Sequence, residues 1–258
     1  MLDEFFLKMH KKLNLRVYLI IVCSLFANYL SATSVSDTLL PSNHKGYTIS
    51  HTYYTISYSE PDKQAEWAAY YLTPASISGT QKRASKFMPD PMITDAIRPS
   101  SYTKSGYDRG HLCPAADMKL NDISMTESFY MSNMSPQAPS FNRGIWSKLE
   151  EKVREWALEK NGVYVVTGPL LNKSCGTIAG SITVPCAYYK IVFKQTGNGA
   201  EAIAFILSNA GSSLPLKQFV VTIDYLETLT GIDFFASLSD AEEEKFESVL
   251  LTNNWQWN

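Results

Sequence analysis

The chain of 258 residues lacks several features that define common protein classes. Its four cysteines include no CxxC pair, which argues against a zinc site built on thiolates. No repeat period and no low-complexity tract occurs, which argues against repeat and disordered architectures. An excess of basic residues is also missing, since Lys and Arg total 23 against 25 Asp and Glu. The hydrophobic content of 45% suits one globular domain with a large core.

The charge distribution gives mixed indications about substrates. Residues 1–36 contain four basic and two acidic residues, so the rest of the chain has a net charge of −4. Proteins that bind nucleic acids non-specifically usually present a basic surface. Between residues 82 and 109 the balance reverses, with six basic residues against three acidic ones. We therefore expect any polyanion site in this stretch, away from the acidic residues 240–247.

The N-terminal segment, residues 1–36, is typical of an export signal. Basic residues up to Arg16 precede the apolar run 17–30 (VYLIIVCSLFANYL), and small residues follow it. The run is shorter than the roughly 20 apolar residues of a membrane span. We predict a signal peptide cleaved within residues 32–36, and a periplasmic or secreted domain of residues 37–258. The alternative is a membrane anchor formed by an uncleaved N-terminal segment.

The cysteines agree with export. Cys23 would leave with the signal peptide. Cys175 and Cys186 flank a glycine-containing segment and are candidates for a disulfide in an oxidising compartment. Cys113 would then be unpaired, two residues away from His111.

The hydrophobic pattern predicts an α+β fold with a mainly antiparallel sheet flanked by helices. Two segments, 47–58 and 65–72, are rich in Tyr, Thr or Ala and predict a β-hairpin. Residues 74–106 contain several prolines and no sustained periodicity, so we expect a long, ordered and functional loop. The other predicted elements are strands at 129–132, 164–167, 181–193 and 202–207, and helices at 142–160, 222–229 and 239–251. No βαβ rhythm occurs, which favours antiparallel pairing.

His111 is the candidate general base, because imidazole titrates near neutrality and can deprotonate water. Arg109 lies two residues before it, and in an extended segment both side chains share one face. Guanidinium and imidazole would then point into one cleft. The alternatives are a structural role for His111 and a surface ion pair between Arg109 and Asp108.

Asn142 and Glu150 are candidates for binding Mg²⁺, because the sequence places an amide and a carboxylate on adjoining faces of the predicted helix. The alternatives are that Asn142 caps the helix and that Glu150 pairs with Arg154 four residues later. Asn133 is a candidate for orienting the histidine, or else a turn former.

Three motifs resemble the DNA/RNA non-specific endonuclease family. They are residues 108–111 (DRGH), residues 132–137 (SNMSPQ), and residues 142–146 (NRGIW) with Glu150 eight residues after Asn142. Their order and spacing agree with the family over most of residues 50–236. The resemblance implies the ββα-metal nuclease fold.

The same resemblance implies a role for each matching residue. His111 corresponds to the general base and Asn133 to an amide near it. Asn142 corresponds to the direct Mg²⁺ ligand, and Glu150 to the carboxylate that binds the metal through water. Arg109 corresponds to the arginine that stabilises charge on the phosphate.

A second phosphate-binding arginine of the family corresponds to Arg83. The resemblance implies hydrolysis of phosphodiester bonds in DNA and RNA, with little sequence specificity and with 5′-phosphate products. Mg²⁺ is the implied cofactor and Mn²⁺ the alternative ion.

Two other functions stay open at this point. The acidic net charge favours a phosphodiesterase that acts on a smaller substrate. A non-catalytic nucleic-acid-binding module on the same fold is the third hypothesis, although a binding module needs no base and metal ligand together. The sequence leaves open whether the chain forms a homodimer, and predicts no membrane partner unless the N-terminal segment is retained.

Overall fold

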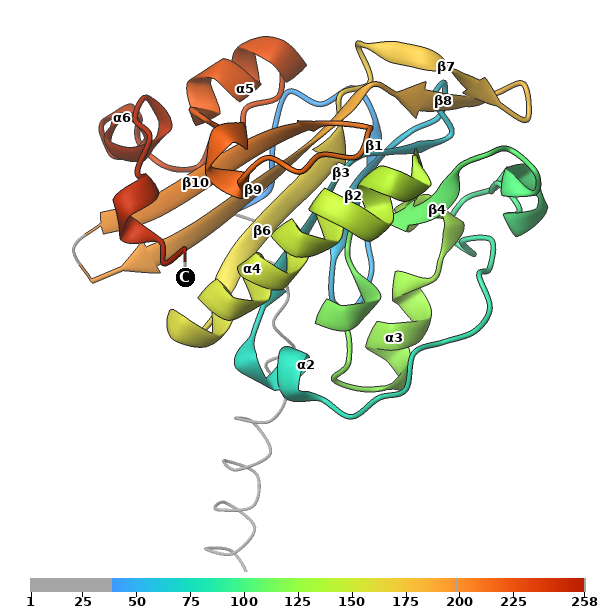
Figure 1. Cartoon of the computed structure of the whole chain (residues 1–258), viewed down its shortest axis with the longest axis horizontal. Helices are drawn as coiled ribbons and strands as arrows, with labels where there is room; N and C mark the ends of the chain where they lie inside the picture. Colours follow the sequence, from blue (N-terminus) through green and yellow to red (C-terminus); the bar gives the residue numbers. More distant parts are fainter. Residues whose placement is uncertain (1–38, 198, 258) are drawn as a thin grey trace, which may run out of the picture. The chain divides into compact units, whose positions relative to one another are not determined.

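The computed structural model describes residues 39–197 and 199–257 (Figure 1). The predicted signal peptide, residues 1–36, lies outside the described residues. Within the described ranges, no helix is both long enough and apolar enough to cross a membrane.

The described domain is built on a seven-stranded sheet in which all neighbouring strands run antiparallel. Its strand order is β1-β2-β3-β6-β9-β10-β11 (Figure 1). The strands are β1 (Tyr47–Ser50), β2 (Thr55–Ser59), β3 (Gln64–Leu72), β6 (Val163–Pro169), β9 (Ala187–Thr196), β10 (Gly199–Ser208) and β11 (Val220–Val221). This arrangement confirms the predicted α+β fold with a mainly antiparallel sheet.

Both faces of the sheet are buried, as strand β6 illustrates. Val163 and Val165 face one apolar cluster, whereas Tyr164 and Val166 face the other. Successive side chains of a strand point to opposite faces, so an unbroken apolar run is buried on both sides. The sheet therefore needs helices on each face.

Helix α4 (Ser147–Glu159) covers the first face, where Leu149, Val153 and Trp156 pack in the cluster of Val163 and Val165. Helices α5 (Ile223–Thr230) and α6 (Asp240–Glu247) cover the second face, near the C-terminal end of the chain (Figure 1). α5 ends at Gly231, whose φ of 74° permits the left-handed stop that its position predicts. α6 ends at Glu247, earlier than the predicted boundary at residue 251.

The predicted helix 142–160 is not continuous. Residues Phe141–Trp146 form a π-helical segment, η5, and α4 begins only at Ser147. Gly144 has φ −112° and ψ −112°, which breaks the regular helical path. Glycine tolerates this conformation because it has no Cβ. The break separates Asn142 from the helix that holds Glu150.

The DRGH motif forms a short strand. β4 (Asp108–His111) pairs antiparallel with β5 (Met134–Gln137), and His111 lies opposite Met134. A Cβ atom at Gly110 would come 2.1 Å from the side chain of Gln137, so the close pairing requires glycine. The strand predicted at 129–132 is wrong, because residues 131–133 form a 3₁₀ turn, η4 (Met131–Asn133), before β5 begins.

The strand predicted at 181–193 and the three cysteines after residue 36 lie in one region of the sequence, residues 113–193. The predicted strand 181–193 is two strands, β8 (Ile182–Pro185) and β9, which are interrupted at Cys186. β8 pairs with β7 (Ser174–Ile178), and a disulfide joins Cys175 to Cys186 in agreement with the cysteine pattern. Cys113 is free and buried.

The long segment 74–106 is ordered, although it contains only two short helices, α2 (Pro74–Ser78) and η2 (Pro99–Tyr102). Asp90 fixes its middle part, because it accepts hydrogen bonds from Ser132 and from the Met92 backbone at 2.9 Å. It also pairs with His51 at 3.0 Å, and both of these side chains are buried. His51 lies in the break between β1 and β2, where the predicted single strand 47–58 divides.

Candidate active site

His111 lies at the end of β4 and is 9% exposed. Its ring is 4.9 Å from the ring of Phe129 and 5.8 Å from that of Phe87, measured between centroids. Burial, and then the positive charge of Arg83, lower the pKa of His111 to about 3. The imidazole is therefore neutral at physiological pH. Its buried Nε2 has no hydrogen-bond partner among the residues that the structure describes.

Arg109 shares a face of β4 with His111, as the extended geometry predicts. Its guanidinium lies 5.2 Å from the centre of the Phe87 ring, which His111 also contacts. Nε and Nη2 donate to the Pro99 carbonyl at 3.1 Å and 2.6 Å. In the described part of the chain, no carboxylate forms an ion pair with Arg109. The alternative pairing with Asp108 is wrong, and the charge remains available for a phosphate.

Arg83 reaches the same place from the long segment 74–106. Its guanidinium lies 5.0 Å from the centre of the Phe129 ring, against which His111 also packs. The side chain is exposed, and its charge contributes to the low pKa of His111. Two arginines therefore flank the histidine on aromatic supports, which brings together three of the residues singled out from the sequence.

Asn142 does not cap α4. Its Nδ2 donates to Asp108 Oδ2 at 2.9 Å, and Arg143 pairs with the same carboxylate at 2.5 Å. Although burial opposes it, these hydrogen bonds from Arg143 and Asn142 lower the pKa of Asp108. Asp108 is thus ionised and fixes the orientation of the amide. The amide oxygen of Asn142 accepts no hydrogen bond within residues 39–197 and 199–257, so it is available to a cation.

Glu150 lies in the first turn of α4 and is partly buried. Burial raises its pKa to about 7, against the lowering effect of the Lys190 charge. The predicted alternative partner, Arg154, instead pairs with Asp117 at 3.0 Å. Within the described residues no hydrogen bond or ion pair engages the Glu150 carboxylate, which leaves both oxygens for water or a metal.

Lys190 is a buried cation whose charge acts on Glu150, and none of the sequence motifs includes it. It comes from β9, is fully buried, and has its Nζ 4.7 Å from the centre of the Trp146 ring. Nζ has no hydrogen-bond partner in the described ranges. Burial lowers the pKa of Lys190, whereas the charges of Glu150 and Asp117 raise it. A lone lysine in the apolar run 187–193 was the available signal.

Asn133 is completely buried and bonds to the main chain around the histidine rather than to its ring. Its Oδ1 accepts from the Cys113 backbone N–H at 2.8 Å, and its Nδ2 donates to the carbonyls of Cys113 and Ser128 at 2.9 Å and 2.8 Å. The side chain therefore fixes the backbone two residues after His111.

The variant Asn133→Ala should lose roughly 3 kcal/mol of unfolding free energy, because three buried main-chain groups lose their partner. Chemical denaturation measures this loss. The exposed Asn253 provides the control, since Asn253→Ala should change stability by less than about 0.5 kcal/mol. A change at Asn133 as small as at Asn253 would contradict the described role.

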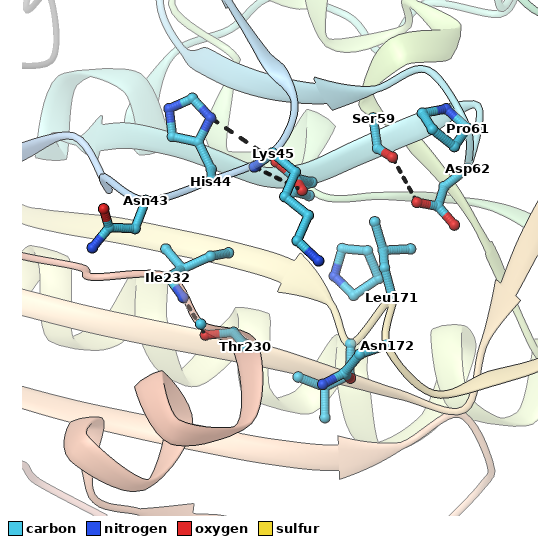
Figure 2. A pocket seen from close by; sticks show the side chains of 14 residues that line it. Asn43, His44, Lys45, Ser59, Pro61, Asp62, Leu171, Asn172, Thr230 and Ile232 are labelled. Atoms are coloured by element: carbon cyan, nitrogen blue, oxygen red, sulfur yellow. Dashed lines mark hydrogen bonds and ion pairs between the residues drawn. The ribbon is translucent and has the colours of Figure 1, made fainter.

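A cavity of about 420 Å³ lies elsewhere in the domain (Figure 2). Its lining includes Lys45, Asp62 and Asn172, and the structure places none of the six candidate residues on its wall. The cavity therefore has no part in the constellation around His111.

Comparison with known proteins identifies the class of protein. The chain is 35% identical over 204 residues to Nuclease C1 of Cunninghamella echinulata var. echinulata, covering 72% of this chain and 81% of the relative. It is 30% identical to mitochondrial endonuclease G of Caenorhabditis elegans, covering 80% and 74%. A crystal structure of an EndoG/EndoGI complex superposes with a TM-score of 0.70 at 27% identity, covering 77% of this chain and 89% of that one. The fold and these relatives define a nuclease.

The family of the protein is established by a family model that matches most of the chain. Residues 32–241 match the model of the DNA/RNA non-specific endonuclease family. The chain belongs to this family and is an endonuclease. The resemblance of the three sequence motifs is thereby confirmed.

Proposed function

We propose that residues 37–258 hydrolyse phosphodiester bonds in DNA and RNA by Mg²⁺-dependent attack of water, with His111 as general base. The main support is the buried Nε2 of His111, which has no partner among the described residues while the ring is neutral. A neutral imidazole with a free nitrogen can take a proton from water. A histidine that only stabilised the fold would bond to its neighbours.

Arg109 and Arg83 neutralise the phosphate in this proposal. Both guanidinium groups lie beside rings that His111 also contacts. Fixed positive charge next to the attacked phosphorus stabilises the additional negative charge of the transition state. The rigid aromatic supports keep the arginines in position before the substrate arrives.

The donor atoms fit a hard divalent cation. Asn142 offers a free amide oxygen that Asp108 orients and would hold the ion directly, and the Glu150 carboxylate would hold it through water. When bound, Mg²⁺ or Mn²⁺ supplies Lewis-acid stabilisation of the leaving oxygen. The charge of Lys190 favours the ionised carboxylate, because it opposes the rise in the pKa of Glu150.

The positions of the acidic residues in the fold remove the reason for expecting a smaller substrate. The acidic helix α6 covers the second face of the sheet, whereas α4 and its Glu150 belong to the first. The exposed Arg83 and the free charge of Arg109 lie at the candidate site. We therefore favour polymeric DNA and RNA, acted on outside the cytoplasm after removal of residues 1–36.

The chemical groups at the ends of the product fragments show which phosphorus–oxygen bond is broken. Attack by water with departure of the 3′ oxygen leaves 5′-phosphates, so fragments should accept labelled phosphate from polynucleotide kinase only after phosphatase treatment. Efficient labelling of untreated fragments would show 5′-hydroxyl ends and would contradict the proposed reaction.

A further inference from the structure

Helices α5 and α6 lie next to each other on the second face of the sheet (Figure 1). Three carboxylates from these two helices lie close together. Asp224 and Glu227 lie three residues apart on α5, and so share one side of that helix. Glu247 is the last residue of α6. One carboxylate oxygen from each residue lies within 4.8 Å of the other two.

The side chain of Glu247 is buried, which is unusual for a carboxylate without a partner. The residue is 7% exposed, and its Oε1 has no hydrogen-bond partner among the described residues. Buried polar oxygens nearly always bond to the protein, to water or to an ion. One carboxylate oxygen of Glu247 lies within 4.8 Å of an oxygen of Asp224 and of Glu227, so a cation between these groups could supply the missing partner.

No positive side chain in the described part of the chain compensates this charge. None of its ion pairs includes Asp224, Glu227 or Glu247. The carboxyl end of α6 adds the partial negative charge of its free carbonyls. The negative charge of the three carboxylates is therefore without a positive side-chain partner among the described residues.

We propose that Asp224, Glu227 and Glu247 hold a divalent cation of the calcium type, which joins α5 to α6. Two oxygens that bind the same ion at about 2.4 Å are at most about 4.8 Å apart, and the three carboxylate oxygens all lie within 4.8 Å of one another. Ca²⁺ accepts six to eight oxygens in flexible geometry, whereas Mg²⁺ requires a regular octahedron with shorter bonds. Water completes the coordination at the exposed Asp224.

Such an ion would hold α6 on the sheet. Phe246 precedes Glu247 and packs its ring against Phe193 and Phe235, at centroid distances of 5.6 Å and 5.3 Å. Binding at Glu247 therefore stabilises this aromatic contact. The ion has a structural role and lies apart from Asn142, whose neighbours belong to the other face.

Thermal unfolding of the full chain, first treated with EDTA and then given Ca²⁺ alone, tests the proposal. Ca²⁺ at ten times its dissociation constant should raise the Tm by roughly 3–6 °C. The same rise should occur in Asn142→Ala, which lacks the proposed active-site ligand. In Glu247→Gln the affinity for Ca²⁺ should fall at least about tenfold, whereas nuclease activity is unchanged.

A matched control is Glu242→Gln, because Glu242 is exposed on the same helix and bonds only to Ser239. This variant should keep the full response to Ca²⁺. Glu247→Gln should also have a higher Tm than the wild type in EDTA, since the amide removes like-charge repulsion. The proposal is wrong if Ca²⁺ leaves the Tm of the wild type unchanged, or if Glu247→Gln responds to Ca²⁺ like the wild type.

Discussion

Replacing His111 by alanine should lower kcat on DNA by about 10³-fold or more, which is the range for loss of a general base. The physical reason is that no other imidazole is present at the site: within the described residues, His44 and His51 bond elsewhere in the fold. Cleavage of a fluorescent duplex, measured at saturating substrate, gives kcat directly. Binding of the same duplex in EDTA should change by less than threefold, because Arg83 and Arg109 remain.

His44 provides the matched control for this experiment. It lines the separate cavity and bonds to Gly46 and Ser57, so His44→Ala should retain activity within about twofold (Figure 2). Circular dichroism establishes that both variants are folded. A folded His111→Ala protein that cleaves DNA at the wild-type rate would exclude His111 as the base.

Replacing Asn142 by alanine should lower kcat/KM by about 10²-fold or more and weaken the activation by Mg²⁺. The amide oxygen is the donor that Asp108 holds in place, and alanine has no atom to replace it. A titration of activity against Mg²⁺ should therefore shift the half-maximal concentration upward at least about tenfold. Asn253→Ala, an exposed change far from the motifs, should leave the titration curve unchanged.

The Asn142 variant also distinguishes a metal ligand from a structural asparagine. Loss of the bond to Asp108 should cost only about 1 kcal/mol of stability, because Arg143 still satisfies that carboxylate. An unchanged Mg²⁺ titration curve, with activity reduced or not, would show that the direct ligand is a different residue.

Much of the sheet was predictable because the apolar runs of β3, β6 and β9 are local signals. The errors fall where backbone bonding decides the structure. The π-helical segment contains the non-helical Gly144, and the predicted strand 181–193 is interrupted at Cys186, which is bonded to Cys175. Neither pattern differs from an ordinary helix or strand in apolar periodicity alone.

In the candidate site, too, features set by local sequence were predictable, and contacts between distant segments were not. The shared face of Arg109 and His111 follows from alternation along one strand, and the structure brings Arg83 and both residues together. The partners of these residues were not predictable, since Asp108 meets Asn142 across 34 positions of sequence. The charge of Lys190 likewise acts on Glu150 from strand β9 and not from any local motif.

The proposed function is metal-dependent hydrolysis of DNA and of RNA. The most direct test incubates residues 37–258 with supercoiled plasmid and with structured RNA, in Mg²⁺ and in EDTA. We predict that both substrates are degraded in Mg²⁺ and that both remain intact in EDTA. A folded protein that cleaves neither substrate in Mg²⁺, or cleaves both equally well in EDTA, would contradict the account.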